Sequence, residues 1–229
     1  MKVEVCRSEI EGTVCAPPSK SYTHRALICS ALTHGTSRIL SPLHSDDTEA
    51  TCRVLSGLGI NFTEGKDSWH VGGGELKRSI SELFCGESGT TLRFMTASCA
   101  LVDGESKLTC GLSLSRRPIV PLLEGLKQLE VDCRSTNGFP PIIVWGKGRV
   151  RGGQVELRGD ISSQFVSALL FVAPLTDEGV SLKLTTSLES KPYVSMTMAI
   201  QRQFGVEVHA SSDMREFNIK RQSYQPTDF

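Results

Sequence analysis

Ser19-Lys20-Ser21, Glu87-Ser88-Gly89-Thr90-Thr91 and Ile161-Ser162-Ser163-Gln164 are the segments that decide the fold, because each precedes an apolar stretch with helical spacing. Ser19 and Ser88 are 69 residues apart, and Ser88 and Ser162 are 74 residues apart, which is a nearly constant period. The apolar stretches end near glycines, at Gly35, Gly104 and Gly179. The sequence therefore predicts one supersecondary unit that is used three times.

A second set of helix starts follows the same period, at Ser45, Ser115 and Ser190. Because a strand is expected before each first helix, every unit reads βαβαββ, and the fold class is α/β (α+β) with three such units in one domain. The predicted helices include 90–100, 118–129, 164–172 and 192–204, and the predicted strands include 37–40, 60–62, 69–71, 106–109, 131–133, 142–144, 180–184, 206–208 and 217–219.

Composition excludes several classes of protein. The chain has 229 residues, 39% hydrophobic and 22% charged, which is typical of one large or two small globular domains. Lys and Arg together number 25, as do Asp and Glu, so we expect no nucleic-acid partner. No apolar run approaches the roughly 18 to 20 residues of a membrane span, and the N-terminus has no signal-peptide character. We therefore expect a cytoplasmic protein with no membrane partner.

Metal binding and nucleophilic catalysis find little support in the sequence. None of the eight cysteines lies in a C-x-x-C pair, so metal-ligand spacing is absent and we expect reduced, mostly buried thiols. The five histidines are scattered, and no Ser/His/Asp arrangement follows from their spacing. Asp46 and Asp47 could act as acid/base groups, but the helix dipole alone explains acidic residues in a first turn.

Basic residues at the predicted helix starts point to an anion-binding site. Lys20 and Arg25 are about 1.4 helical turns apart and can approach the same side, where Lys provides a point charge and Arg a planar fork. Arg116 and Arg117 precede a predicted helix, where cations oppose the helix dipole unless an anion is bound. Gly89 would let a ligand approach the main chain closely. The alternative is a set of ordinary capped helices whose basic residues are solvated.

Six segments together carry a resemblance: Pro18-Ser19-Lys20-Ser21 with Arg25, Ser45-Asp46-Asp47, Gly86-Glu87-Ser88-Gly89-Thr90-Thr91-Leu92-Arg93, Arg117-Pro118-Ile119, Ser162-Ser163-Gln164-Phe165 and Ser190-Lys191-Pro192-Tyr193. In order and spacing they resemble the 5-enolpyruvylshikimate-3-phosphate synthases (3-phosphoshikimate 1-carboxyvinyltransferases), and the resemblance covers the whole chain. The residues of these segments are most similar to those of the archaeal branch of that family. The resemblance implies the enolpyruvyl transferase fold, in which each of two domains is built from three βαβαββ units.

The resemblance implies an enzyme of the shikimate pathway, which serves chorismate and aromatic amino acid biosynthesis. In the family, the 5-hydroxyl of shikimate 3-phosphate adds to C2 of phosphoenolpyruvate, and phosphate leaves through a tetrahedral intermediate. Family members need no metal or organic cofactor, so none is expected, and Lys20 is the implied catalytic residue. The implied ligands of shikimate 3-phosphate are Lys20, Ser21, Arg25, Ser162, Ser163, Gln164, Ser190 and Tyr193. The implied ligands of phosphoenolpyruvate, with which glyphosate competes, are Lys20, Gly89, Arg117 and Gln164.

Length is the departure from the family, because members have a second domain and this chain is about half as long. We expect residues 1–13 to form a strand that belongs to the missing domain, residues 14–222 to form the three-repeat domain, and residues 223–229 to be a tail toward the missing domain. The chain is expected to be monomeric, to need the missing C-terminal domain as a partner, and to be inactive alone. The alternative function is a stand-alone binding module for a phosphorylated small molecule.

Overall fold

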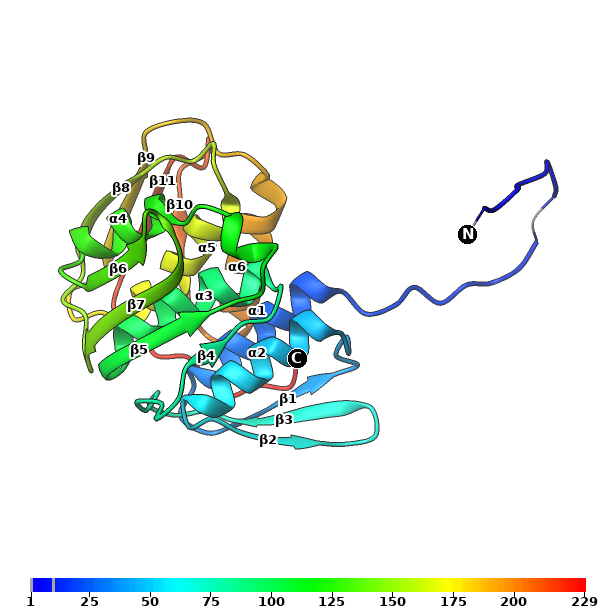
Figure 1. Ribbon diagram of the computed structural model, residues 1–229, viewed down its shortest axis with the longest axis horizontal. Coiled ribbons are helices and arrows are strands. Elements are labelled where there is room, and N and C mark those ends of the chain that lie inside the picture. The colour runs from blue at the N-terminus through cyan, green and yellow to red at the C-terminus, as the bar shows by residue number, and fades with distance from the viewer. Residues whose placement is uncertain (1, 10) are drawn as a thin grey trace.

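Three helices occupy the centre of the computed structural model, which describes residues 2–9 and 11–229 (Figure 1). They are α1 (Lys20–Ala31), α3 (Gly89–Ser98) and α5 (Ser163–Val172), the first helices of the three predicted units. Every residue of α1 from Thr23 to Ala31 is buried. Beyond its first turn, this helix is therefore buried on all sides and not only on its predicted apolar face.

The three serines that define the sequence period are the N-caps of these helices, which confirms the repeat. The hydroxyl oxygens of Ser19, Ser88 and Ser162 each accept a hydrogen bond from a main-chain N–H of the first turn, at 3.5, 3.2 and 3.3 Å. Each cap satisfies one of the N–H groups that have no partner inside a helix at its start.

Within the described residues, the strands form three sheets, one from each unit. The first has the order β1 (Thr36–Leu40), β3 (Ser68–Gly72), β2 (Asn61–Glu64). The second has the order β4 (Leu83–Phe84), β5 (Asp103–Thr109), β7 (Phe139–Lys147), β6 (Asp132–Thr136). The third has the order β10 (His209–Ala210), β11 (Glu216–Ile219), β9 (Val180–Leu184), β8 (Gly153–Leu157). The second helices of the units are α2 (Asp46–Gly57), α4 (Val120–Gln128) and α6 (Lys191–Gln203).

The first unit lacks the leading strand that the sequence predicts. In the other two units this strand runs parallel to the strand after the first helix, β4 beside β5 and β8 beside β9. Residues 2–9 and 11–19 contain no strand and are exposed, and Figure 1 shows them extending away from the body of the molecule. Met1 and Ile10 lie outside the described residues. The strand predicted over 1–13 is therefore wrong where the chain is described, and its assignment to a second domain stays a prediction.

Residues 224–229 take the position of that leading strand. The N–H of Arg38 donates to the carbonyl of Thr227 at 3.0 Å, and the N–H of Phe229 donates to the carbonyl of Arg38 at 2.8 Å. Arg38 thus pairs in parallel with the residue between them, as leading strands do in the other units. The segment 223–229, predicted as a tail toward the missing domain, is thus joined to β1 by main-chain hydrogen bonds, and its relation to a second domain stays a prediction.

The helix predicted at 118–129 begins later, at Val120. Ile119 is the N-cap with a non-helical φ of −132°, and Pro121 lies in the first turn, where its missing N–H costs nothing. Proline also disfavours helical dihedrals in the residue before it, which applies to Arg117 before Pro118. Arg117 accordingly is extended, with φ −97° and ψ 123°. Ser115, predicted as a helix start, lies instead in a 3₁₀ turn that ends at Arg116.

The strand predicted at 206–208 is also displaced, since β10 covers only His209–Ala210. The side chain of Gln222 takes the place of a strand partner. Its Oε1 accepts from the N–H of Glu207 at 2.8 Å, and its Nε2 donates to the carbonyl of Glu207 at 2.9 Å.

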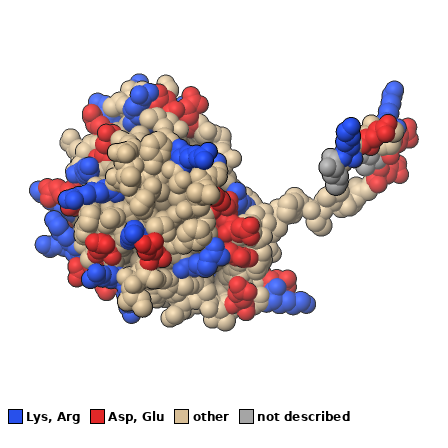
Figure 2. Space-filling view, viewed as in Figure 1, with Lys and Arg blue, Asp and Glu red and all other residues tan. Residues whose placement is uncertain are grey.

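The described surface and thiols add few constraints. Lys and Arg lie among Asp and Glu over the face shown in Figure 2, in keeping with a formal net charge of zero. In the described part of the chain, no helix is long and apolar enough to span a bilayer. The eight cysteines are free thiols, of which Cys29, Cys85, Cys99 and Cys133 are buried.

A buried network of hydroxyl groups joins the starts of α1, α2 and α3. His24, with 1% of its surface exposed, places Nδ1 2.8 Å from the hydroxyl of Thr51. The Thr51 hydroxyl lies 2.7 Å from that of Thr91, which donates to the Oγ of the N-cap Ser88 at 2.7 Å. His24 Nε2 has no partner among the described residues. Burial lowers the pKa of His24 to about 4; Asp47 opposes this shift, and Lys20 and Arg25 add to it.

We predict that His24 makes the fold less stable as the pH falls from 7 to 5. The unfolded histidine binds a proton near pH 6.5 and the folded one only near pH 4, so between these values protonation favours the unfolded state. The expected loss by pH 5 is about 2 kcal/mol, measured by urea unfolding. In His24→Gln this part of the pH dependence should disappear. If the free energy of unfolding changes with pH in the same way in the wild type and the variant, the prediction is contradicted.

We also predict that Tyr224→Phe destabilises the fold by about 1–3 kcal/mol. Tyr224, 2% exposed, donates its hydroxyl to the carbonyl of Phe171 at 2.9 Å and accepts from Gln201 Nε2 at 2.8 Å. The variant leaves both groups without this buried partner. Chemical denaturation provides the measurement, and Tyr193→Phe, at a side chain 46% exposed, is the matched control. Equal stability of the two variants would show that the docked segment does not depend on Tyr224.

Candidate functional site

The structure brings all ten implied ligand residues to one cavity of about 500 Å³. They come from all three units and from helix starts that lie far apart in the sequence. The residues that line the cavity as predicted are Lys20, Ser21, Arg25, Gly89, Arg117, Ser162, Ser163, Gln164, Ser190 and Tyr193. Asp47, Glu87, Thr90, Arg93, Ile161 and Glu189 line it as well. The placement is a structural result, and the ligand roles stay predictions.

The position of the cavity follows from the orientation of the central helices. The first turns of α1, α3 and α5 all contribute to its wall, through Lys20, Gly89 and Ser163 among others. A helix start carries N–H groups without an intrahelical partner and about half a positive charge. Three such starts on one cavity make it suited to anions.

Arg25 holds a buried positive charge beside the cavity. It is 2% exposed, and in the described part of the chain no carboxylate forms an ion pair with it. Its neutral partners are the hydroxyl of Thr197 at 2.7 Å from Nε, the carbonyl of Ser21 at 2.9 Å from Nη1, and the carbonyl of Tyr193 at 3.2 Å from Nη2. Burial lowers its pKa to about 10, so the guanidinium stays charged at neutral pH.

Lys20 lies at the first position of α1 with its ammonium directed toward α2. Its Nζ donates to a carboxylate oxygen of Asp47 at 2.7 Å, with the two side chains 50% and 28% exposed. Asp47 occupies the first turn of α2, where the helix dipole also favours it. In the sequence, the helix dipole alone explains the acidic residue at Asp47. The ion pair that holds Lys20 is seen only in the structure.

Gly89 leaves room for an arginine, and its predicted contact with a ligand stays a prediction. A Cβ at this position would lie 2.7 Å from Arg93 Nη1, which is too close, and 3.6 Å from Arg117 Nη1, which is an ordinary contact, so the missing side chain makes room for the guanidinium group of Arg93. Arg93 donates from Nη1 to Gln164 Oε1 at 2.7 Å. Burial lowers the pKa of Arg93, and the nearby charge of Arg117 lowers it further. The pattern Gly-x-x-x-Arg was the available signal for Arg93, because residues four apart share one face of a helix.

The serines on the cavity wall divide into structural and free groups. Ser162 is the N-cap of α5, whereas the side chain of Ser163, in a residue 7% exposed, lies in the first turn and lines the cavity. Ser190 precedes α6 in the left-handed region, with φ 54° and ψ 44°. A non-glycine residue there is strained by about 1–3 kcal/mol, and such strain is concentrated at functional sites.

Glu87 places a carboxylate on the cavity wall that is held by main-chain N–H groups rather than by a cation. Its two oxygens accept from the main-chain N–H groups of Ser113 at 3.2 Å and Leu114 at 2.7 Å. These N–H groups begin the 3₁₀ turn that leads to Arg117. Glu87 therefore fixes the loop that carries Arg117, a long-range contact that local sequence spacing does not reveal.

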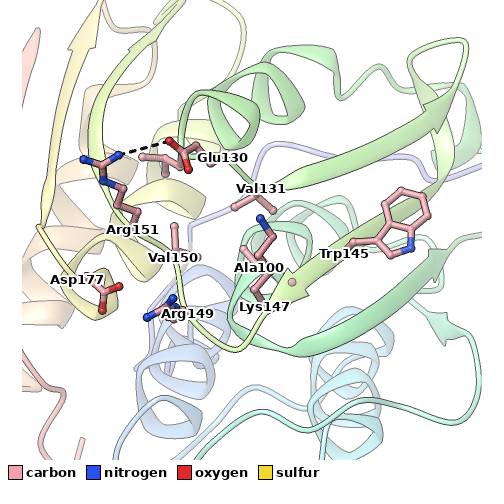
Figure 3. Close-up of a pocket in the computed structure, with 11 residues that line it drawn as sticks. Ala100, Glu130, Val131, Trp145, Lys147, Arg149, Val150, Arg151 and Asp177 are labelled. Carbon is pink, nitrogen blue, oxygen red and sulfur yellow. Dashed lines mark ion pairs between the residues drawn. The ribbon is translucent and has the colours of Figure 1, made fainter.

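A second hollow, of about 270 Å³, is lined by helix ends rather than helix starts (Figure 3). It lies where α3 and α4 end, near Ala100 and Glu130, and helix ends disfavour anions. Its cation Arg151 pairs with Glu130 at 3.7 Å and with Glu178 at 3.0 Å. Lys147, Arg149 and Asp177 also line this hollow and form no ion pair among the described residues, but none of the ten implied ligand residues lies there, so the first cavity is the stronger candidate.

Comparisons with known proteins agree with the geometry. The model of the EPSP synthase (3-phosphoshikimate 1-carboxyvinyltransferase) family matches residues 6–228. A 3-phosphoshikimate 1-carboxyvinyltransferase of Dehalococcoides mccartyi strain BAV1 is 44% identical over 232 residues, 100% of this chain and 54% of the relative. That of Methanothermobacter thermautotrophicus is 44% identical over 224 residues, 96% of this chain and 52% of the relative.

A solved structure extends the comparison to the fold. EPSP synthase from Acinetobacter baumannii matches with a TM-score of 0.84 at 24% identity, over 95% of this chain and 48% of that one. This confirms the three-unit fold expected for an enolpyruvyl transferase. The chain spans about half the length of the curated relatives it matches. Since the family model covers nearly all of its residues and its relatives reach 44% identity, the chain belongs to the EPSP synthase family.

Proposed function

We propose that this chain is the shikimate 3-phosphate-binding half of a 3-phosphoshikimate 1-carboxyvinyltransferase. The observation that supports this most directly is the gathering of ten family-matched residues at a cavity where Arg25, Arg93 and Arg117 have no ion-pair partner among the described residues. A ligand that carries both a phosphate and a carboxylate complements several separated positive groups. The proposed enzyme is monomeric and cytoplasmic.

Arg25 is suited to one of these anionic groups. A guanidinium has five N–H donors, and the protein uses one on Nε, one on Nη1 and one on Nη2. One donor therefore stays on each terminal nitrogen, which is the fork that a carboxylate or phosphate accepts from. Ser21 and Tyr193, whose carbonyls hold the guanidinium, also line the cavity.

In the proposed reaction, the 5-hydroxyl oxygen of shikimate 3-phosphate loses its proton and bonds to C2 of phosphoenolpyruvate, while C3 gains a proton. The tetrahedral intermediate then loses a proton from C3 as the bond between C2 and the phosphate oxygen breaks, which releases phosphate. The residues of this chain would bind and orient both anions and stabilise the charge that develops between them. Lys20 is the proposed catalytic group, with its ammonium held by Asp47. Gly89, Arg117 and Gln164 are the other proposed contacts to phosphoenolpyruvate.

A second lobe is part of the proposal, because the relatives are about twice as long. Lys20 is half exposed and Tyr193 is 46% exposed, so charges at the rim of the cavity are screened by water. Closure of a second lobe would exclude this water and strengthen the same interactions.

We predict that Ser163→Ala weakens shikimate 3-phosphate binding by about tenfold to a hundredfold, because a hydrogen bond to a charged group is lost. Ser162→Ala should in addition lower the stability of the fold by about 1 kcal/mol, because it removes the N-cap. Calorimetric titration and thermal melts measure the two effects, and exposed Ser212→Ala is the control. Arg25 is a poorer test, because its burial makes replacement costly to the fold. Wild-type affinity in Ser163→Ala would place the anion elsewhere.

We further predict that phosphoenolpyruvate and glyphosate bind this chain only when the complementary lobe is added. A small, strongly hydrated anion held from one side stays in water, where charge pairs contribute little. Glyphosate titrations followed by NMR should show no binding to the chain with shikimate 3-phosphate, and binding after the lobe is added. Lys20→Ala should abolish that recovery, whereas exposed Lys66→Ala should not. Tight glyphosate binding to the chain alone would contradict the need for a second lobe.

Release of phosphate at a normal rate by the chain alone would likewise contradict the need for a second lobe. Shikimate 3-phosphate binding without turnover, even with the lobe present, would favour the stand-alone binding module.

A further inference from the structure

A short chain of hydrogen bonds joins α3 to α5 on the cavity wall. Arg93 Nη1 donates to Gln164 Oε1 at 2.7 Å, and Gln164 Nε2 donates to the hydroxyl oxygen of Thr90 at 2.9 Å. Gln164 and Thr90 come from different units, and all three residues line the cavity. The chain therefore connects two of the three helix starts.

Chemistry sets the direction of this chain. A guanidinium has donors only, so the atom of Gln164 that faces Arg93 has to be the amide oxygen. The amide nitrogen then faces Thr90, whose oxygen acts as the acceptor. The Thr90 O–H and the second N–H of Gln164 are left to donate to other groups. Each member of the chain thus donates away from Arg93. This part of the cavity wall therefore presents hydrogen-bond donors to a ligand.

Packing and the absence of a competing carboxylate keep Arg93 in position. Its guanidinium lies over the ring of Phe165, 5.5 Å from the centroid. The absence of a side chain at Gly89 leaves room for Nη1. Within the described residues, Arg93 forms no ion pair, and its buried Nε has no partner. No carboxylate therefore competes with Gln164 for this guanidinium.

We propose that Arg93 is a positioning residue that fixes the amide orientation of Gln164, so that the wall between α3 and α5 presents donors to a bound anion. Without Arg93, the amide of Gln164 can rotate by half a turn and place its oxygen against the anion. The two ends of a glutamine amide are nearly the same size, so packing alone selects neither orientation. This inference deepens the proposed function, from which the identity of the anion is taken.

The orientation of Gln164 is tested without any ligand. In the wild-type chain, NMR should detect cross-relaxation between the side-chain amide protons of Gln164 and the side chain of Thr90. In Arg93→Met this signal should weaken as the amide samples both orientations. An unchanged signal in the variant would overturn the proposal. If Arg93→Met does not fold, the wild-type spectrum still decides, because absence of the signal contradicts the orientation.

A double-mutant cycle tests whether Arg93 acts through Gln164. Arg93→Met and Gln164→Leu should each weaken shikimate 3-phosphate binding by roughly tenfold or more, measured by calorimetry. The double variant should bind no more weakly than Gln164→Leu. Additive losses would mean that Arg93 contacts the anion directly, which overturns a positioning role.

Arg134→Met is the matched control, because Arg134 also packs its guanidinium over an aromatic ring, that of Trp145 at 5.2 Å. Arg134 lies outside the cavity, so Arg134→Met should bind shikimate 3-phosphate as tightly as the wild type does. A loss of affinity equal to that of Arg93→Met would overturn the proposal. If the wild-type chain fails to bind shikimate 3-phosphate, the proposed function fails, while the spectroscopic test of Arg93 still stands.

Discussion

Positive charge gathers around one cavity because three helix starts and three arginines face it. Among the described residues, none of Arg25, Arg93 and Arg117 forms an ion pair with a carboxylate. Like charges this close repel each other, and burial adds a desolvation cost. The packing of the central helices offsets this cost, for example where the rings of Phe94 and Phe171 meet edge to face at 5.0 Å. Packing thus maintains an arrangement that electrostatics alone would disperse.

Neutral oxygens keep the cations in place without cancelling them. Arg25 is held by a hydroxyl and two carbonyls, and Arg93 by an amide oxygen. A carboxylate in either position would hold the guanidinium as firmly but remove its net charge. Three acids line this region beside four cations: Asp47 pairs with Lys20, Glu87 accepts from main-chain N–H groups, and Glu189 forms no ion pair among the described residues. The cavity therefore keeps a charge that a ligand can neutralise.

Local pattern was enough to predict the first helix of each unit and its serine cap, because capping depends on residues within one turn, whereas the helix start predicted at Ser115 was wrong. The ten cavity residues came from the family resemblance, and the fold places all of them together. Arg93 and Glu87 were missed because their partners, Gln164 and the loop at Ser113, are distant in sequence. The strand position of residues 224–229 was missed for the same reason, since a short polar segment has no period that reveals its partner.

The pairing of β1 with residues 224–229 also constrains how the chain folds. Arg38 and Asp228, which meet across this edge, are separated by 190 positions. Contacts of such long range form slowly, because a large loop has to close before they contribute. During synthesis, β1 leaves the ribosome early. Its neighbour, residues 224–229, is not available for pairing until the last residues of this segment leave the ribosome. Until then β1 presents an unpaired strand edge, and such an edge can pair with another chain.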